Sequence, residues 1–143
     1  MLKGISAVIS PELIKTLMEM GHGDELVIAD GNFPSASIAQ RLVRADGLGC
    51  SVLLDAILSI FPLDQYVVKP VALMAIVSGD TYKPIIWDDY RKIVKQHEPD
   101  FTDFEYMERF AFYERARKAY AVLATSEMAL YANIILKKGV IKS

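Results

Sequence analysis

The segment Leu26-Val27-Ile28-Ala29 decides the fold, because it is apolar at every position. A strand with one face in water alternates apolar and polar residues, so an unbroken apolar run indicates a strand covered on both faces. The run ends at Asp30-Gly31-Asn32, where three residue types that favour turns follow one another. We therefore predict a buried strand over residues 26–29 that ends in a loop.

Helical and strand-like patterns alternate through the rest of the chain. Ser10 and Pro11 fit an N-cap and a first-turn proline, and they predict a helix over residues 11–20 that stops before Gly21. Apolar spacing predicts further helices over residues 52–60, 86–97 and 109–119. Further strands are expected over residues 41–44, 71–77, 121–124 and 131–136. This order predicts an α/β fold, in which residues 1–143 form a single layered domain with a mostly buried β-sheet flanked by helices.

Length and composition restrict the possible functions. The chain has 143 residues, 52% of them hydrophobic, which suffices for one core and hints at buried subunit interfaces. The net charge is −2 and basic residues do not alternate with aromatic ones, so we expect no nucleic-acid partner. The longest apolar run, residues 71–77, is far shorter than the ~18 residues of a membrane helix, so no membrane partner is expected.

Cofactor motifs are missing from the sequence. There is no glycine-rich dinucleotide fingerprint, no P-loop and no nucleophile elbow. Cys50 is the only cysteine, and the two histidines stand 75 positions apart, so the spacing of a metal site is missing too. We expect no metal and no other cofactor, and we expect Cys50 to be a buried, inert thiol in a cytoplasmic protein.

His22 and Asp30 flank the decisive strand and are the first candidates for chemistry. His22 lies between Gly21 and Gly23, just past a helix C-terminus, where the backbone can turn sharply and a ligand can approach closely. A histidine that only caps the preceding helix is the alternative. Asp30 follows the carboxyl end of a buried strand, where α/β sheets tend to bind ligands. A carboxylate that merely closes a turn is the alternative there.

Tyr131 and Asn133 form a second candidate pair. If residues 131–136 are a strand, these two side chains point to the same side, because residues two apart share a face. An amide both donates and accepts hydrogen bonds, so such a pair suits the recognition of hydroxyl groups. An ordinary solvent-facing pair explains the pattern equally well.

Arg109 and His97 are weaker candidates. Arg109 stands at a predicted helix start, where a cation is mildly unfavourable, and this hints that it serves another purpose. A surface ion pair with Glu108 or Asp103 is the simpler interpretation. His97 falls on the apolar face of its helix and is interpreted as a satisfied core histidine.

The whole pattern resembles the ribose pyranase and L-fucose mutarotase family. The resemblance rests on motifs in a fixed order, and it extends from Met1 to Val140. The motifs are Gly21-His22-Gly23-Asp24-Glu25, Asp30 with Phe33-Pro34, Arg44-Ala45-Asp46-Gly47, and the ending Tyr131-Ala132-Asn133-Ile134-Ile135-Leu136-Lys137-Lys138-Gly139-Val140. The segment Arg109-Phe110-Ala111-Phe112-Tyr113-Glu114-Arg115-Ala116 is similar to the L-fucose mutarotase branch in particular.

The resemblance implies an enzyme that interconverts the α and β anomers of L-fucose. It also implies a ring-shaped decamer in the cytoplasm that needs neither metal nor nucleotide. His22 matches the family's proton donor, and the sugar-binding positions match Asp30, Arg109, Tyr131, Asn133 and, through its backbone, Ala132. A ribose-type pyranase and a non-catalytic sugar-binding regulatory protein are the alternative functions.

The chemistry of mutarotation suits these residue types. The hemiacetal ring opens, the C1–C2 bond rotates, and the ring closes on the other face, so one group takes a proton while another gives one. Imidazole can serve in both directions at neutral pH, and Asp30 could be the partner base or could simply hold hydroxyl groups.

The distance between His22 and Asp30 raises a question about the site. An extended segment between them separates the two residues by roughly 20 Å at ~3.3 Å per residue, too far for one monosaccharide to touch both. Either the chain curls at one end of the strand, or one site draws its residues from two subunits. We expect a site at a subunit interface.

Overall fold

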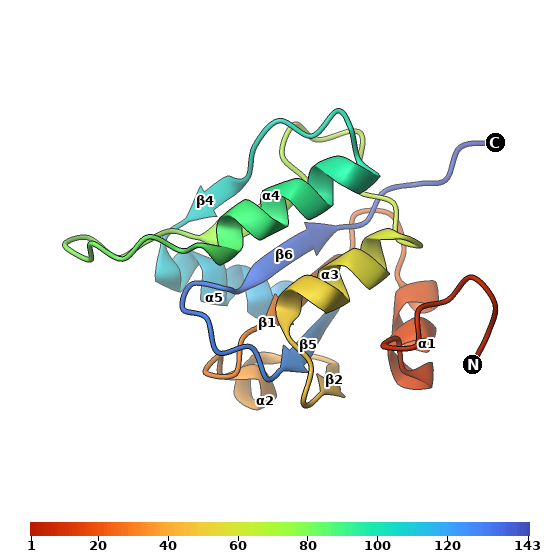
Figure 1. Cartoon of the computed structure of the whole chain (residues 1–143), viewed down its shortest axis with the longest axis horizontal. Coiled ribbons are helices and arrows are strands. Elements are labelled where there is room, and N and C mark those ends of the chain that lie inside the picture. Colours follow the sequence, from red (N-terminus) through yellow and green to blue (C-terminus); the bar gives the residue numbers. More distant parts are fainter.

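Strand β1 (Glu25–Ala29) lies inside a six-stranded sheet with the order β2-β5-β1-β6-β3-β4. The computed structural model describes residues 1–143 (Figure 1). The other strands are β2 (Leu42–Ala45), β3 (Val71–Met74), β4 (Glu105–Met107), β5 (Ala121–Thr125) and β6 (Ile134–Lys137). β6 is antiparallel to β1 and β3, whereas the other neighbouring pairs are parallel. Every strand except β6 therefore ends at the same edge of the sheet.

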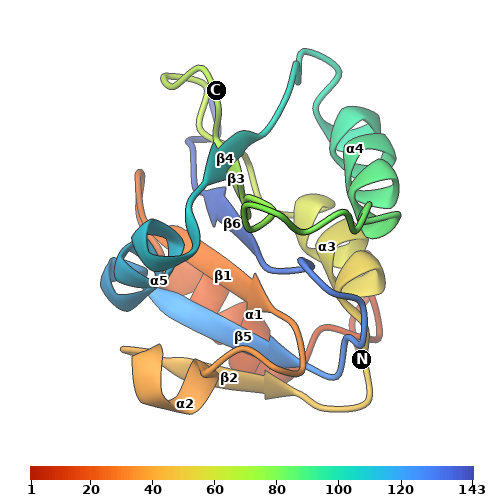
Figure 2. The ribbon, with the colours of Figure 1, turned by 90° about the vertical axis from the view of Figure 1, so that its left-hand side faces the viewer.

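Helices cover both faces of the sheet (Figures 1 and 2). Helices α3 (Cys50–Leu58) and α4 (Ile86–His97) lie on one face, and α1 (Pro11–Glu19) packs into the same apolar core. The short helix α2 (Ser35–Ile38) and helix α5 (Arg109–Lys118) cover the other face. None of these helices has the length and apolar character needed to cross a membrane.

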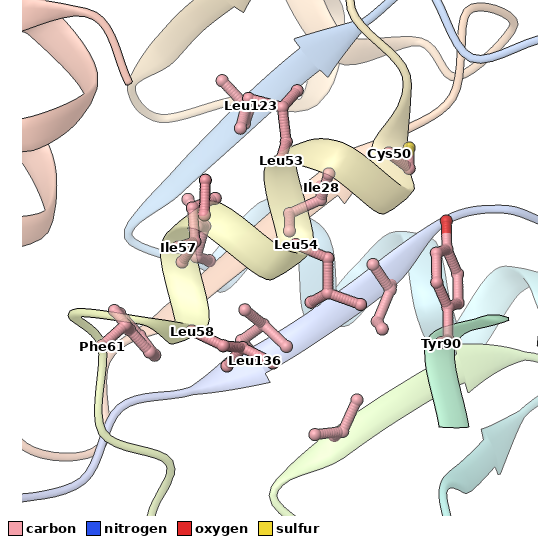
Figure 3. Packing of buried hydrophobic residues seen from close by; sticks show 14 of the residues in the cluster. Ile28, Cys50, Leu53, Leu54, Ile57, Leu58, Phe61, Tyr90, Leu123 and Leu136 are labelled. Carbon is pink, nitrogen blue, oxygen red and sulfur yellow. The ribbon is translucent and has the colours of Figure 1, made fainter. Parts of the chain in front are cut away.

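The apolar run in β1 is explained by these two layers. Ile28 belongs to the larger core with Leu53 and Leu54 of α3 (Figure 3), whereas Val27 points into the smaller core with Phe112 of α5. All five side chains are fully buried. Burying one such side chain stabilises the fold by about 1.5–3 kcal/mol, so neither face of β1 tolerates a polar residue.

The α/β fold predicted from the sequence is confirmed, with small differences at the ends of elements. Helix α4 has the predicted bounds, and Ser10 caps α1 by accepting a hydrogen bond from the N–H of Leu13 at 3.0 Å. The strand predicted over residues 71–77 is too long, because β3 ends at Met74. Its partner β4 is only three residues long and offers no pairing beyond Met107. The hydrogen bond from the N–H of Ala75 to the carbonyl of Met107 is the last one between the two segments, and the chain leaves the sheet after it. The short elements α2 and β4 were not predicted.

The strand predicted over residues 131–136 is wrong at its beginning. β6 starts only at Ile134, and Tyr131 has a left-handed φ of 57°. A left-handed residue cannot continue a strand, so Tyr131 and Asn133 do not share a strand face as predicted. Tyr131 lies in the turn that precedes β6 instead.

Candidate functional site

The antiparallel pairing of β1 with β6 places Asp30 beside Asn133. Ile28 is opposite Ile134 in the register, so Asn133 comes opposite Ala29, the last residue of β1, and next to Asp30, which follows it. The N–H of Asp30 donates to Oδ1 of Asn133 at 2.7 Å. Two segments 103 residues apart are thereby joined at one edge of the sheet.

Strands β3 and β4 end at the same edge and bring in the remaining candidates. Met74 is opposite Met107 at their carboxyl ends, and Arg109 begins α5 directly afterwards. A cavity of about 260 Å³ opens here, lined by residues from four segments of the chain, among them Asp30, Asp80, Arg109, Tyr131 and Asn133. This volume is just below the ~300 Å³ at which pockets for drug-sized ligands begin, so the cavity suits a smaller molecule.

Asp30 is a largely buried carboxylate in this cavity. Its side chain accepts a hydrogen bond from the N–H of Asn32 at 3.0 Å, and the residue is 8% exposed. Burial raises the pKa of Asp30, and the hydrogen bonds from backbone N–H groups only partly oppose this. A carboxylate with a raised pKa is a stronger base than an ordinary one, which suits a group that exchanges protons.

Asn133 presents a hydrogen-bond donor to the cavity. Because Oδ1 accepts from the N–H of Asp30, the orientation of the amide is fixed and Nδ2 carries the two remaining donors. Nδ2 makes no hydrogen bond within the chain, although the residue is only 5% exposed. A ligand hydroxyl in the cavity can accept from it.

Ala132 lies between the two polar residues and is fully buried. Its carbonyl accepts a hydrogen bond from the hydroxyl of Tyr90 at 2.6 Å, which occupies one of the two lone pairs of the oxygen. Its backbone N–H interacts with the carboxylate of Asp30 and contributes to lowering that group's pKa against burial. Tyr90, which was not among the predicted site residues, therefore holds the backbone of this segment in place.

The phenol of Tyr131 is held by the loop that follows β3. It donates to Oδ2 of Asp80 at 2.6 Å and accepts from the N–H of Val77 at 3.3 Å. The ring of Tyr82 stacks on that of Tyr131, with 6.1 Å between centroids. The hydrogen bond to Tyr131 lowers the pKa of Asp80, and the same bond raises the pKa of Tyr131.

Arg109 forms no ion pair, so the simpler interpretation of this residue is wrong. Asp103 pairs with Arg91 at 3.4 Å, and Glu108 caps α5 by accepting from two backbone N–H groups. The guanidinium of Arg109 lies 5.4 Å from the ring centroid of Tyr113, at the mouth of the cavity. Its donors are free to bind oxygen atoms of a ligand.

His22 lies at the opposite end of β1 and does not reach this cavity. The N–H of Gly23 bonds to the carbonyl of Lys138, which fixes the turn beside the far end of β6. His22 lines a second cavity of about 510 Å³, together with apolar residues that include Ile14, Met18 and Phe61. The structure therefore brings together Asp30, Arg109, Tyr131 and Asn133 but not His22.

The capping role considered for His22 is not observed. The carbonyl of Met20 at the end of α1 accepts instead from Nζ of Lys138. Nε2 of His22 lies 3.1 Å from Oδ1 of Asp64, and 46% of the histidine side chain is exposed. The ring is therefore held on one side and accessible on the other.

Two further residues behave much as the sequence indicates. His97 is satisfied by Oδ1 of Asp55 at 2.7 Å, although its side chain is 19% exposed and does not belong to the core. Cys50 is fully buried, and burial raises its pKa to about 11. A thiol with so high a pKa is a poor nucleophile, as predicted.

Sequence reasoning missed Asp64 and Asp80. Asp80 lies in the loop that follows β3, so a carboxylate after a second buried strand of the same sheet was a usable signal. Asp64 meets His22 across 42 residues of chain, and no local pattern indicates that contact. No group of three or more His, Cys, Asp or Glu side chains is arranged to hold a metal ion.

Comparisons with known proteins give a consistent result. A family model described as the RbsD / FucU transport protein family matches residues 3–141. The L-fucose mutarotase of Actinobacillus pleuropneumoniae serotype 5b is 52% identical over 140 residues, which cover 98% of this chain and 97% of the relative.

Among solved structures, the fucose mutarotase of Streptococcus pneumoniae in complex with L-fucose is 55% identical, with a TM-score of 0.95 over 99% of this chain and all of that one. RbsD of Bacillus subtilis complexed with D-ribose is 21% identical, with a TM-score of 0.73 over 99% of this chain and all of that one, and shares the fold.

Proposed function

The chain belongs to the RbsD / FucU family, as the resemblance of its motifs predicted, and on that premise we propose that it interconverts the α and β anomers of L-fucose. It is then an isomerase of the mutarotase type, formed by residues 1–143 as one functional unit. The relative that carries this activity in its name matches nearly the whole chain, and a similar solved structure holds L-fucose.

The cavity at the carboxyl edge of the sheet is the observation that carries this proposal. It combines the carboxylate of Asp30, the guanidinium of Arg109 and the amide of Asn133, which offer both donors and acceptors to sugar hydroxyls. Apolar side chains such as Phe33 and Tyr113 line the rest of the cavity and can face the C–H groups of the ring. Few polar groups in fixed orientations among apolar ones are typical of small-molecule sites.

The proposed reaction transfers two protons and needs no covalent intermediate with the protein. Asp30 takes the proton of the anomeric hydroxyl as C1–O1 becomes a carbonyl and the bond from C1 to the ring oxygen breaks. His22 gives a proton to the ring oxygen. After rotation about the C1–C2 bond, the ring closes on the other carbonyl face and both protons return. General acid–base catalysis of this kind contributes about 10²–10⁴-fold.

Asp30 and His22 act together in this scheme only if two copies of the chain share a site. The two residues lie at opposite ends of β1 and line different cavities. Apolar side chains are exposed beside both: Met18 and Ile141 near His22, and Leu130 at the other cavity. We propose a cytoplasmic homo-oligomer, a ring-shaped decamer, in which His22 of one copy completes the cavity of its neighbour.

Saturation-transfer proton NMR on equilibrated L-fucose tests the function. One anomeric signal is irradiated with and without the protein, and the loss of intensity at the other signal gives the exchange rate. We expect transfer with the wild type and none above the uncatalysed level with His22→Asn. D-ribose in a parallel sample is the control. Faster exchange on D-ribose than on L-fucose would show that the protein is a pyranase. Exchange on neither sugar would contradict the proposed function.

A further inference from the structure

His22 forms a close pair with the carboxylate of Asp64, which lines neither the cavity beside His22 nor the cavity beside Asp30. Nε2 of His22 is 3.1 Å from Oδ1 of Asp64, whose side chain is only 4% exposed, whereas that of His22 is 46% exposed. The ring of Tyr66 lies beside the imidazole, with 5.5 Å between the ring centroids. One edge of the imidazole is thus turned to a buried acceptor and the other to the cavity.

Asp64 is itself held in place from several sides. Its N–H donates to the carbonyl of Lys137 at 3.0 Å, and Oδ1 accepts from the N–H of Tyr66 at 3.0 Å. Gly139 packs directly against this segment, so close that a Cβ there would overlap the carbonyl of Leu63. The position of the carboxylate is therefore fixed by the backbone of β6 and its continuation, and not by the histidine.

The charge state of Asp64 determines which nitrogen of His22 carries a proton. Burial acts to raise the pKa of Asp64, but the hydrogen bonds from Tyr66 and His22 outweigh it and the pKa is lowered. An ionised carboxylate only accepts hydrogen bonds, so the atom that faces it, Nε2, must carry the hydrogen. Nδ1 has no hydrogen-bond partner within the chain.

We propose that Asp64 is a positioning residue that keeps a proton on Nε2 of His22 and directs Nδ1 to the sugar. The proposal rests on the proposed mutarotase function. When Nδ1 is also protonated, the carboxylate stabilises the imidazolium that donates to the ring oxygen. When Nδ1 has given up that proton, Nε2–H stays on Asp64 and the lone pair of Nδ1 is aimed to take it back. One nitrogen thus serves both ring opening and ring closure.

A purely structural role for Asp64 makes different predictions. In that case the carboxylate only stabilises the turn to Tyr66, and replacing it changes stability without a selective effect on catalysis. The chain offers a matched control, because His97 and Asp55 form a second histidine–aspartate pair at 2.7 Å, away from both cavities. Asp55→Asn perturbs the same chemistry where no proton transfer to a sugar takes place.

The test compares Asp64→Asn, Asp64→Ala and Asp55→Asn with the wild-type full chain. Exchange rates at several L-fucose concentrations give kcat and KM, and thermal unfolding shows that each variant is folded. We expect kcat to fall about 10- to 100-fold in both Asp64 variants, within the ~10²–10⁴-fold range of general acid–base catalysis, and KM to stay within about twofold. Asp55→Asn should keep the wild-type kcat.

The protonation state of His22 is read separately, by nitrogen NMR of the imidazole in the protein without sugar. The wild type should carry the hydrogen on Nε2, and Asp64→Ala should populate both tautomers. A neutral imidazole that carries its hydrogen on Nδ1 in the wild type, or folded Asp64 variants with wild-type kcat, would overturn the proposal. A wild type that holds Nε2–H on Asp64 but exchanges no L-fucose anomers would instead overturn the proposed function.

Discussion

The N–H of Asp30 donates a 2.7 Å hydrogen bond to Oδ1 of Asn133, and this bond joins the end of one buried strand to the start of its antiparallel neighbour. It fixes the amide so that Nδ2 is left for a ligand, and it holds the backbone that carries the carboxylate. The amide of Asn133, which is proposed to bind the sugar, and the carboxylate of Asp30, which is proposed to deprotonate it, are thus held in place by one hydrogen bond.

Asn133→Ala should weaken both the fold and the site. The substitution leaves the buried N–H of Asp30 without an acceptor, which costs about 1–3 kcal/mol of the free energy of unfolding. Urea denaturation measures this, with Ser37→Ala, which removes an exposed hydroxyl from α2, as the control. An unchanged unfolding midpoint for Asn133→Ala would mean that the hydrogen bond does not form in solution.

Asp80→Asn should change binding but hardly stability. Asp80 and Tyr131 meet at an exposed position, so the hydrogen bond between them orients the phenol without supporting the core. We expect KM for L-fucose to rise about two- to fivefold, since exposed contacts contribute little. Tyr82→Phe keeps the stacked ring and should leave KM unchanged. Equal KM values for Asp80→Asn and the wild type would exclude a role of Asp80 in orienting Tyr131.

The raised pKa of Asp30 predicts a pH-dependent effect of Asp30→Asn on stability. The folded state binds the proton of the Asp30 carboxyl more tightly than the unfolded state does, so protonation of Asp30 stabilises the fold. This stabilisation is complete at pH values below the ordinary pKa of 3.8, and it is lost as the pH rises through the folded-state pKa. Asp30→Asn should therefore stabilise the protein more, relative to the wild type, at pH 7 than at pH values near 3.8. Denaturant unfolding at both pH values measures the difference, and the opposite order would contradict a raised pKa.

Gly139→Ala should loosen the segment that carries Asp64. The added Cβ would overlap the backbone carbonyl of Leu63, so either the segment around residue 139 or the segment around residue 63 must shift. We expect a lower unfolding temperature together with a lower exchange rate, because the shift moves the carboxylate away from His22. Gly21→Ala is the control for stability, since its Cβ would meet only an ordinary contact with Asp24. A fully stable, fully active Gly139→Ala variant would show that the approach is looser than described.

The sequence predicts those parts of this molecule that depend on local pattern. The apolar run at residues 26–29 indicates a strand covered on both faces, and the structure places Val27 and Ile28 in different cores. The spacing of residues 86–97 gives helix α4 with its bounds. Elements of three or four residues, such as β4 and α2, are too short to have a periodicity, so they were missed.

Contacts between distant segments could not be predicted in the same way. The left-handed backbone of Tyr131 overrides its strand-like surroundings, because the turn before β6 sets its conformation. Asp64 reaches His22, and Asp80 reaches Tyr131, only through the tertiary fold. The separation of His22 from Asp30 was inferred from the length of the strand alone, and the structure places the two residues in different cavities.

Mixing two inactive variants tests most directly whether one site for L-fucose is shared between two copies. His22→Asn removes the proton donor and Asp30→Asn the base, and we expect each alone to be inactive in the saturation-transfer experiment. When both are co-expressed in equal amounts and assemble at random, about a quarter of the shared sites contain both native residues. The account predicts that the mixed oligomer regains exchange of L-fucose anomers at about that fraction of the wild-type rate. A mixed oligomer as inactive as its parents would contradict a site that takes His22 and Asp30 from different copies.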